Sequence, residues 1–108
     1  MADLQWNKTF ALEQTGGDQE LLDELLELFR DSSAADLAQL RQAVAADDAA
    51  GVVRAAHAIK GAAASLGLES VRDLAQAMES DGRQGSVAVA RTHLEHLAEL
   101  LAQVNALD

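Results

Sequence analysis

The 108-residue sequence contains no cysteine and no proline, and aromatic side chains make up only 3% of it. Without cysteine, disulfide bonds, thiolate metal ligands and a cysteine nucleophile are all excluded. The few aromatic residues give little support to a β-sandwich or barrel, whereas the abundance of alanine and leucine and the lack of proline favour helices. The composition therefore predicts an all-α protein that depends on packing for its stability.

Long apolar runs are also missing. No stretch approaches the ~20 residues that span a membrane, and the first residues, MADLQWNKTF, lack the basic start and apolar run of a secretory signal. Positive charge is scarce, because 8 lysine and arginine residues stand against 18 aspartate and glutamate residues and give a formal charge of −10. Such a field repels nucleic acid and anionic membranes. We therefore expect a cytoplasmic protein whose charge permits protein partners.

Apolar residues recur every three or four positions through most of the chain, which is typical of helices with one buried face. A short helix carrying Phe10 is expected to begin after Asn7 and to end by Thr15-Gly16-Gly17, with Trp6 packing this segment onto the rest. The long helix that follows keeps its spacing if Ser33 lies on the buried face, and a bend there is allowed. The four longer stripes comprise Leu22, Leu26, Phe29, Leu37, Leu40 and Val44; Val52, Ala56, Ile59, Ala63 and Leu66; Val71, Leu74, Ala75 and Met78; and Val87, Ala90, Leu94, Leu97, Leu101 and Val104.

Capping residues and glycines separate these stripes. Asp18 can cap the first long helix, and Asp47-Asp48 marks its far boundary. Gly67 is a natural stop for the next helix. The segment Asp81-Gly82-Arg83-Gln84-Gly85 is rich in turn formers, and Ser86 can cap the final helix.

Residues 1–108 are therefore expected to form a single domain, an antiparallel four-helix bundle with a short additional N-terminal helix laid over one end. A coiled coil is disfavoured, because each stripe lasts only a few turns before a turn signal. A monomer is expected, since no long apolar stripe remains without a neighbour.

One stripe of the helix after Asp48 carries His57, Lys60, Gly61 and Ala64. His57 lies about 160° around the helix from Ile59, so its imidazole is expected to be exposed. A glycine inside a helix costs about 1 kcal/mol relative to alanine, but at Gly61 it allows another surface to approach the backbone, and Ala64 keeps that approach shallow. Lys60 can offset the charge of an incoming dianion. Since a neutral imidazole already presents a lone pair near physiological pH, the stripe is typical of a nucleophile that needs no separate base.

The segment from His57 to Gly67, HAIKGAAASLG, closely resembles the site helix of histidine-containing phosphotransfer (HPt) domains. The histidine, the lysine and both glycines stand at the family's positions, and the predicted helices around them match the family's bundle across nearly the whole chain. The sequence Gly16-Gly17-Asp18 before a leucine-rich helix is similar too.

The resemblance implies that His57 accepts a phosphoryl group from an aspartyl phosphate on a receiver domain and passes it to the aspartate of another receiver. Receiver domains of hybrid sensor kinases and response regulators are the implied partners, and the receiver is expected to supply Mg²⁺, so the chain needs no cofactor of its own. The implied transfer surface includes Lys60, Gly61 and Ala64. Relatives often place a polar side chain from the next helix beside the imidazole, where it can orient the ring, and Glu79 is the expected match.

A nucleotide site is not indicated, because the sequence has no P-loop, dinucleotide glycine motif or kinase nucleotide loop. The protein is therefore expected to carry phosphate without acting as an ATP-dependent kinase, as a stand-alone module. A helical adaptor that binds partners through the same face without being phosphorylated is the main alternative. A metal site at His93 and His96 is a weaker one, since two ligands without a third make a poor site.

Overall fold

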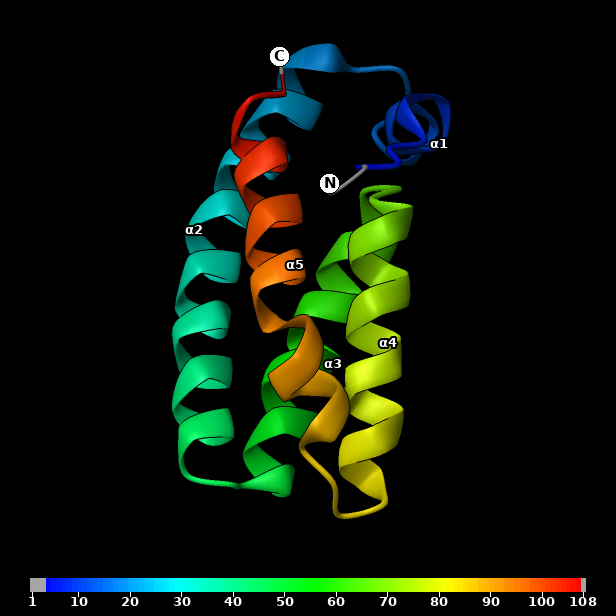
Figure 1. Cartoon of the computed structure of the whole chain (residues 1–108). Helices are drawn as coiled ribbons and strands as arrows, with labels where there is room; N and C mark the ends of the chain where they lie inside the picture. Colours follow the sequence, from blue (N-terminus) through cyan, green and yellow to red (C-terminus); the bar gives the residue numbers. More distant parts are fainter. Residues whose placement is uncertain (1–3, 108) are drawn as a thin grey trace.

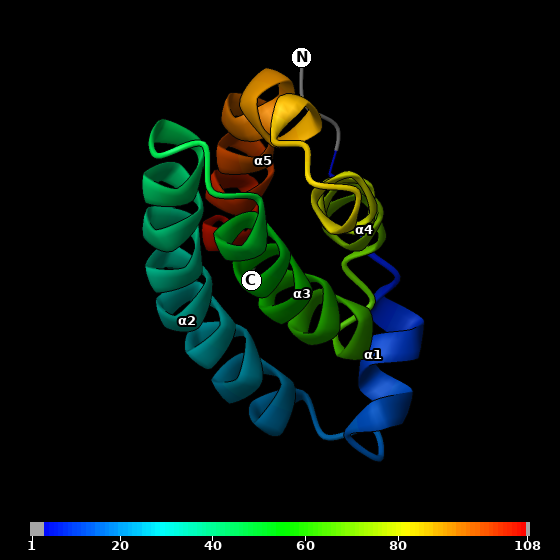
Figure 2. The same ribbon diagram turned by 90° about the horizontal axis from the view of Figure 1, so that it is seen from below.

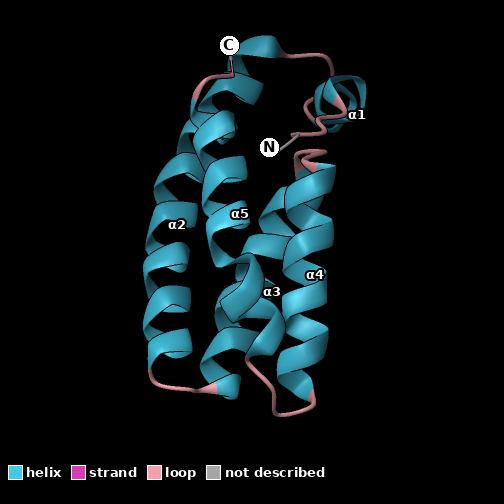
Figure 3. Cartoon of the chain, viewed as in Figure 1, coloured by secondary structure: helices cyan, strands magenta, loops and turns pink. Residues whose placement is uncertain are grey.

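The computed structural model describes residues 4–107 and is helical throughout most of that range (Figures 1 and 3). Short connections join the helices, and no strand forms among these residues beyond one isolated bridge between Trp6 and Leu68. The prediction of an all-α fold is confirmed. The helices are α1 (Lys8–Gln14), α2 (Gln19–Ala45), α3 (Ala49–Ser65), α4 (Glu69–Arg83) and α5 (Ala88–Asn105).

The four long helices form an antiparallel bundle. In Figure 1 helices α2 and α4 run in one direction while α3 and α5 run in the other. Each helix packs against the next along the chain, and α5 returns to pack against α2, which closes the bundle (Figure 2). Helix α1 lies at the end where α2 begins and α3 finishes. The predicted four-helix bundle with a short N-terminal helix is therefore confirmed.

Three of the helices begin at side chains that satisfy a free backbone N–H. Asn7 Oδ1 accepts from the N–H of Phe10 at 3.0 Å, and Asp18 Oδ1 accepts from that of Leu21 at 3.1 Å. Asp48 Oδ1 accepts from Gly51 N–H at 3.0 Å and so caps α3, the helix that carries His57. The start of this helix is thus fixed by its own sequence, as an aspartate cap stabilises a helix by about 1 kcal/mol.

The predicted apolar stripes make up one continuous core. Ser33 also lies on the buried face of α2, with its hydroxyl donating to the carbonyl of Arg30, and the helix continues without interruption past it. Burying one face of each helix is the main force that holds a bundle of this size together. Members of all four stripes are at most 1% exposed, among them Leu22, Leu26, Leu40, Val52, Ile59, Val71, Met78, Leu97 and Val104.

The break after α4 falls inside the segment 81–85, where the sequence predicts it. The helix ends at Arg83, and the turn comes at Gly85, where φ is +86°. Ser86 accepts from Ala88 N–H at 3.1 Å, but the residue that precedes α5 is Val87. Because α4 includes Arg83, this residue lies four positions after Glu79 on the same helix face.

The segment before α1 is joined to the end of α3 by hydrogen bonds. Trp6 Nε1 donates to the carbonyl of Leu66 at 3.0 Å, and the N–H of Asn7 donates to the carbonyl of Gly67 at 2.8 Å. Trp6 therefore holds the N-terminal segment against the bundle, as the sequence predicts.

Among the turn glycines, Gly67 is expected to tolerate a side chain least. Its φ is +70°, and a Cβ atom there would lie 2.6 Å from the carbonyl oxygen of Asn7. We expect Gly67→Ala to lower the free energy of unfolding by about 3 kcal/mol, measured by urea denaturation. Gly85→Ala is the matched control, because Gly85 also has a positive φ but has no atom within 4 Å, so it should lose only about 1 kcal/mol. Equal losses for the two variants would contradict the role given to the contact with Asn7.

Candidate functional site

The predicted exposed stripe of α3 lies on the surface of the bundle. The His57 side chain is 64% exposed, whereas Ile59, two residues on, is fully buried. Nothing lies within 4 Å of the position that a Cβ of Gly61 would take, and Ala64 is half-buried. The backbone beyond His57 is thus open to an approaching surface, as expected.

Glu79 points into the bundle from α4. Its side chain is only 2% exposed, because it lies on the helix face that also buries Val71, Ala75 and Met78. Gly82, one turn further on, packs so closely on α3 that a Cβ there would meet Val53 Cγ2 at 2.8 Å. This close approach of the two helices brings the Glu79 carboxylate to the level of His57.

Three side chains converge on the Glu79 carboxylate. His57 Nδ1 lies 2.9 Å from Oε2, and Arg83 Nη2 lies 2.6 Å from the same oxygen. Lys60 Nζ lies 2.6 Å from Oε1 as an ion pair. The structure therefore places Glu79 beside the imidazole, where the resemblance to HPt domains implies a polar side chain.

Lys60 pairs with Glu79, the carboxylate that contacts the imidazole, and its side chain is only 25% exposed. The sequence does not predict this pairing. It is explained by the burial of the carboxylate, because a charge removed from water needs a partner. Lys60 and Arg83 together bring one more positive charge than Glu79 neutralises, so the site keeps an excess of positive charge next to the imidazole.

The cations keep Glu79 ionised in spite of its burial. The hydrogen bond from Lys60 lowers the pKa of Glu79 most, and those from Arg83 and His57 lower it further, while burial acts in the opposite direction. The net effect takes the pKa of this carboxyl from its ordinary value of 4.5 to about 2. Glu79 is therefore a carboxylate throughout the physiological pH range.

This depressed pKa predicts a loss of stability in acid. A carboxyl with a pKa of about 2 in the folded state and 4.5 when unfolded stabilises the fold above pH 4.5, and that contribution disappears as the pH falls toward 2. We expect the difference in unfolding free energy between wild type and Glu79→Gln to be largest near neutral pH and to shrink across this range. Urea denaturation at a series of pH values measures it. Glu99→Gln, at an exposed position, is the control and should differ little from wild type at any pH.

Arg83 belongs to this cluster but is absent from the sequence prediction. Its side chain is 62% exposed and reaches Glu79 Oε2 from one turn along α4. The spacing of four residues between Glu79 and Arg83 is a signal for an ion pair, yet it applies only if the helix continues that far. Because the surrounding residues are typical of a turn, the sequence alone gives no reason to extend the helix.

The contact with Glu79 fixes which nitrogen of His57 carries the proton. An ionised carboxylate only accepts hydrogen bonds, so Nδ1 must donate, and in the neutral ring Nε2 then carries the lone pair. Between residues 4 and 107 no protein group hydrogen-bonds to Nε2. His57 is thus an exposed imidazole with its nucleophilic nitrogen free and its other nitrogen held.

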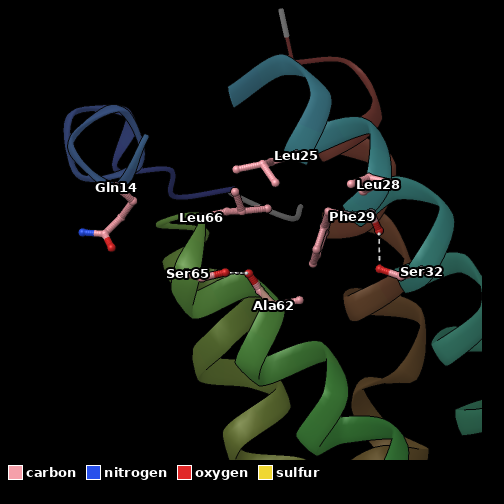
Figure 4. Close-up of a pocket in the computed structure, with 8 residues that line it drawn as sticks. All are labelled: Gln14, Leu25, Leu28, Phe29, Ser32, Ala62, Ser65 and Leu66. Carbon is pink, nitrogen blue, oxygen red and sulfur yellow. Dashed lines mark hydrogen bonds between the residues drawn. The ribbon is translucent and has the colours of Figure 1, made fainter. Parts of the chain in front are cut away.

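An apolar hollow of about 530 Å³ lies between the first half of α2 and the end of α3, the helix that carries His57 (Figure 4). Leu28 on its rim is 64% exposed, which is unusual for a leucine. The hydroxyls of Ser32 and Ser65 donate to carbonyls of their own helices, so these polar groups are already satisfied. The hollow is lined by Gln14, Leu25, Leu28, Phe29, Ser32, Ala62, Ser65 and Leu66.

The two histidines of α5 lie apart from this site. His93 and His96 are both exposed, and the described part of the chain holds no group of three or more side chains arranged to bind a metal ion. The metal-binding alternative therefore gains no support from the geometry.

Comparison with known families identifies this arrangement. The family model of the Hpt domain matches residues 24–107, a range that includes the helices carrying His57 and Glu79. The chain belongs to the Hpt domain family. Histidine phosphotransfer in phosphorelays is the activity of Hpt domains, which act as phosphoryl carriers and not as kinases.

A solved Hpt domain has the same fold. The HPT domain of an Hpt sensor hybrid histidine kinase from Shewanella superimposes with a TM-score of 0.78, covering 94% of this chain and 91% of that one at 24% sequence identity. The likeness places the bundle among Hpt folds. No curated protein sequence matches the chain. Within residues 4–107 no helix is both long and apolar enough to cross a membrane.

Proposed function

We propose that this Hpt domain carries a phosphoryl group on His57 between two receiver domains of a phosphorelay. The observation that supports it most directly is the state of the imidazole, whose side chain is 64% exposed and whose Nδ1 is held by Glu79. Nε2 is then the nucleophile. The whole chain is proposed to work as one domain and as a monomer in the cytoplasm.

The transfer needs little covalent assistance from this protein. The Nε2 lone pair attacks the phosphorus of an aspartyl phosphate, the bond from phosphorus to the carboxylate oxygen breaks, and the aspartate leaves with that electron pair. The reverse reaction delivers the group to a second receiver. Because the transition state of phosphoryl transfer is loose, alignment and charge balance dominate, and we expect the receiver to contribute Mg²⁺.

Each predicted site residue has a part in this scheme. Glu79 orients the ring, and the excess positive charge that Lys60 and Arg83 leave at the site offsets the incoming dianion. Gly61 and Ala64 keep the surface low so that the receiver's aspartate reaches Nε2. A carrier without kinase activity of its own is proposed, since the sequence has no P-loop and no kinase nucleotide loop.

The apolar hollow is proposed to receive an apolar surface of the receiver. Ser65 on the rim of the hollow follows His57 by about two helical turns, with Gly61 between them, so a partner that extends from the hollow along α3 would reach the imidazole. Most of the binding energy at protein interfaces comes from buried apolar contacts, which the lining of the hollow can make. The acidic surface around the hollow cannot make such contacts.

Leu28→Glu tests this surface. We expect the affinity for the receiver to fall at least tenfold, because a charge on the rim must be desolvated when the hollow is covered. Isothermal titration calorimetry measures the change. Phosphorylation by a small phosphoramidate should proceed at the wild-type rate, and Ala88→Glu, at the far end of the bundle, should bind normally. Unchanged binding by Leu28→Glu would remove the hollow from the interface.

The proposal as a whole is tested by intact-mass analysis after exposure to a phosphorylated receiver domain. A single phosphoryl adduct that is labile in acid and stable in base is expected, since phosphohistidine behaves in this way. Binding without any adduct would instead support the alternative function, a helical adaptor that contacts receivers through the same face.

A further inference from the structure

The group that contacts Nδ1 of His57 is the carboxylate of Glu79, and its negative charge has a consequence beyond orienting the ring. The oxygen lies 2.9 Å from Nδ1, and the Glu79 side chain is 2% exposed. An ionised carboxylate has no proton to give, so this contact is favourable only while Nδ1 carries one. Nδ1 must therefore carry a proton both before and after a phosphoryl group is attached to Nε2.

The groups around Glu79 keep its negative charge in place. Helix α3 contributes Lys60 and His57, and α4 contributes Arg83. Neither α2 nor α5 brings an ion pair to Glu79 within residues 4–107. Two permanent cations hold the carboxylate ionised, so the group in contact with Nδ1 is negatively charged, although Glu79, Lys60 and Arg83 together carry a net positive charge.

The proton on Nδ1 decides how well the ring leaves phosphorus. When Nε2 is phosphorylated with Nδ1 protonated, the ring is positively charged. As the acceptor oxygen attacks phosphorus, the N–P bond breaks, its electron pair goes to Nε2, and a neutral imidazole departs. Without the Nδ1 proton the same step would release an imidazolate anion, which is a far poorer leaving group.

We propose that Glu79 retains the Nδ1 proton on phosphorylated His57 and so keeps the phosphoryl group in its readily transferred form at neutral pH. The inference rests on the proposed carrier function. It makes Glu79 a positioning residue whose negative charge also stabilises the protonated ring. A glutamine would orient the ring through the same hydrogen bond without supplying the charge. The difference between the two side chains therefore isolates the effect.

The test compares wild type with Glu79→Gln after phosphorylation by a small phosphoramidate. With the donor removed, loss of the adduct is followed by intact mass from about pH 5 to about pH 9. A neighbouring opposite charge typically keeps a group protonated to a pH that is higher by about one to three units, and at this exposed ring we expect about one unit. As the pH rises, the hydrolysis rate of the adduct should therefore fall at a pH about one unit higher in wild type than in Glu79→Gln. Above neutral pH, wild type should then lose the adduct about tenfold faster than the variant.

Glu99→Gln is the matched control and should follow wild type, because its side chain is exposed on α5. A second measurement needs no variant. The ¹⁵N chemical shift of Nδ1 in phosphorylated wild type should report a protonated nitrogen to higher pH than in free phosphohistidine. It decides the question even if Glu79→Gln does not fold.

Identical pH profiles for wild type and Glu79→Gln, or a wild-type ring that loses its proton at the same pH as free phosphohistidine, would overturn the inference while leaving the carrier function intact. An absence of any adduct on wild type would contradict the carrier function itself, and the inference would fall with it.

Discussion

Replacing His57 with glutamine is expected to abolish phosphorylation by a receiver domain while leaving the bundle folded. The side chain is 64% exposed and makes no contribution to the apolar core, so the thermal midpoint should change by only a few degrees. Glutamine can still donate to the Glu79 carboxylate, but its amide nitrogen has no lone pair available for attack. Intact mass and circular dichroism measure the two effects.

The other histidines provide controls for this experiment. His93→Gln and His96→Gln alter exposed imidazoles on α5, far along the sequence from the site, and both should retain the wild-type adduct. A phosphoryl group that persists in His57→Gln and disappears in either of these variants would move the carrier site to α5.

Gly61→Gln is expected to slow transfer from a phosphorylated receiver at least a hundredfold. A side chain there has free space around it in the isolated protein, and glutamine is a better helix former than glycine, so the fold should be more stable by about 0.5 kcal/mol. In the complex the same side chain lies where the partner must approach. A displacement of even about 1 Å costs roughly a hundredfold in rate when catalysis depends on alignment.

A small phosphoramidate separates obstruction from a damaged nucleophile. It reaches Nε2 without covering the helix, so Gly61→Gln should react with it at nearly the wild-type rate. Equal slowing with both donors would show that the substitution acts on His57 itself, and an unchanged rate with the receiver would mean that Gly61 is not covered in the complex.

The bundle could be predicted because each long helix has an apolar stripe, and two of these helices also begin at an aspartate cap. Asp18 and Asp48 mark starts that the structure confirms, and Ser33 lies on the buried face where the spacing requires it. The exposed position of His57 follows from the same helical geometry, since Ile59 must point into the core.

The exact end of α4 within the predicted segment 81–85 could not be read from local preferences. Asp81 and Gly82 are turn formers, yet the helix includes them because tertiary contacts outweigh propensity. Gly82 packs against Val53, and Asp81 accepts a hydrogen bond from Val89 N–H across the following turn. These contacts involve residues distant in sequence.

The charged cluster was therefore only partly predictable. Glu79 was expected near the imidazole from the resemblance to HPt domains, and its spacing from Val71 and Ala75 is also that of a buried face. The role of Arg83 could not be predicted, because it requires α4 to include Asp81 and Gly82, which are turn formers. The pairing of Lys60 with Glu79 could not be predicted either, because the two side chains lie on different helices.

A two-step transfer measures the central claim most directly. The protein is mixed with a receiver domain labelled with ³²P on its aspartate, separated from it, and then given a second, unlabelled receiver with Mg²⁺. Our account predicts that acid-labile label first moves to His57 and then leaves it for the second receiver. Stable complex formation with each receiver, without label ever entering the Hpt domain, would contradict it.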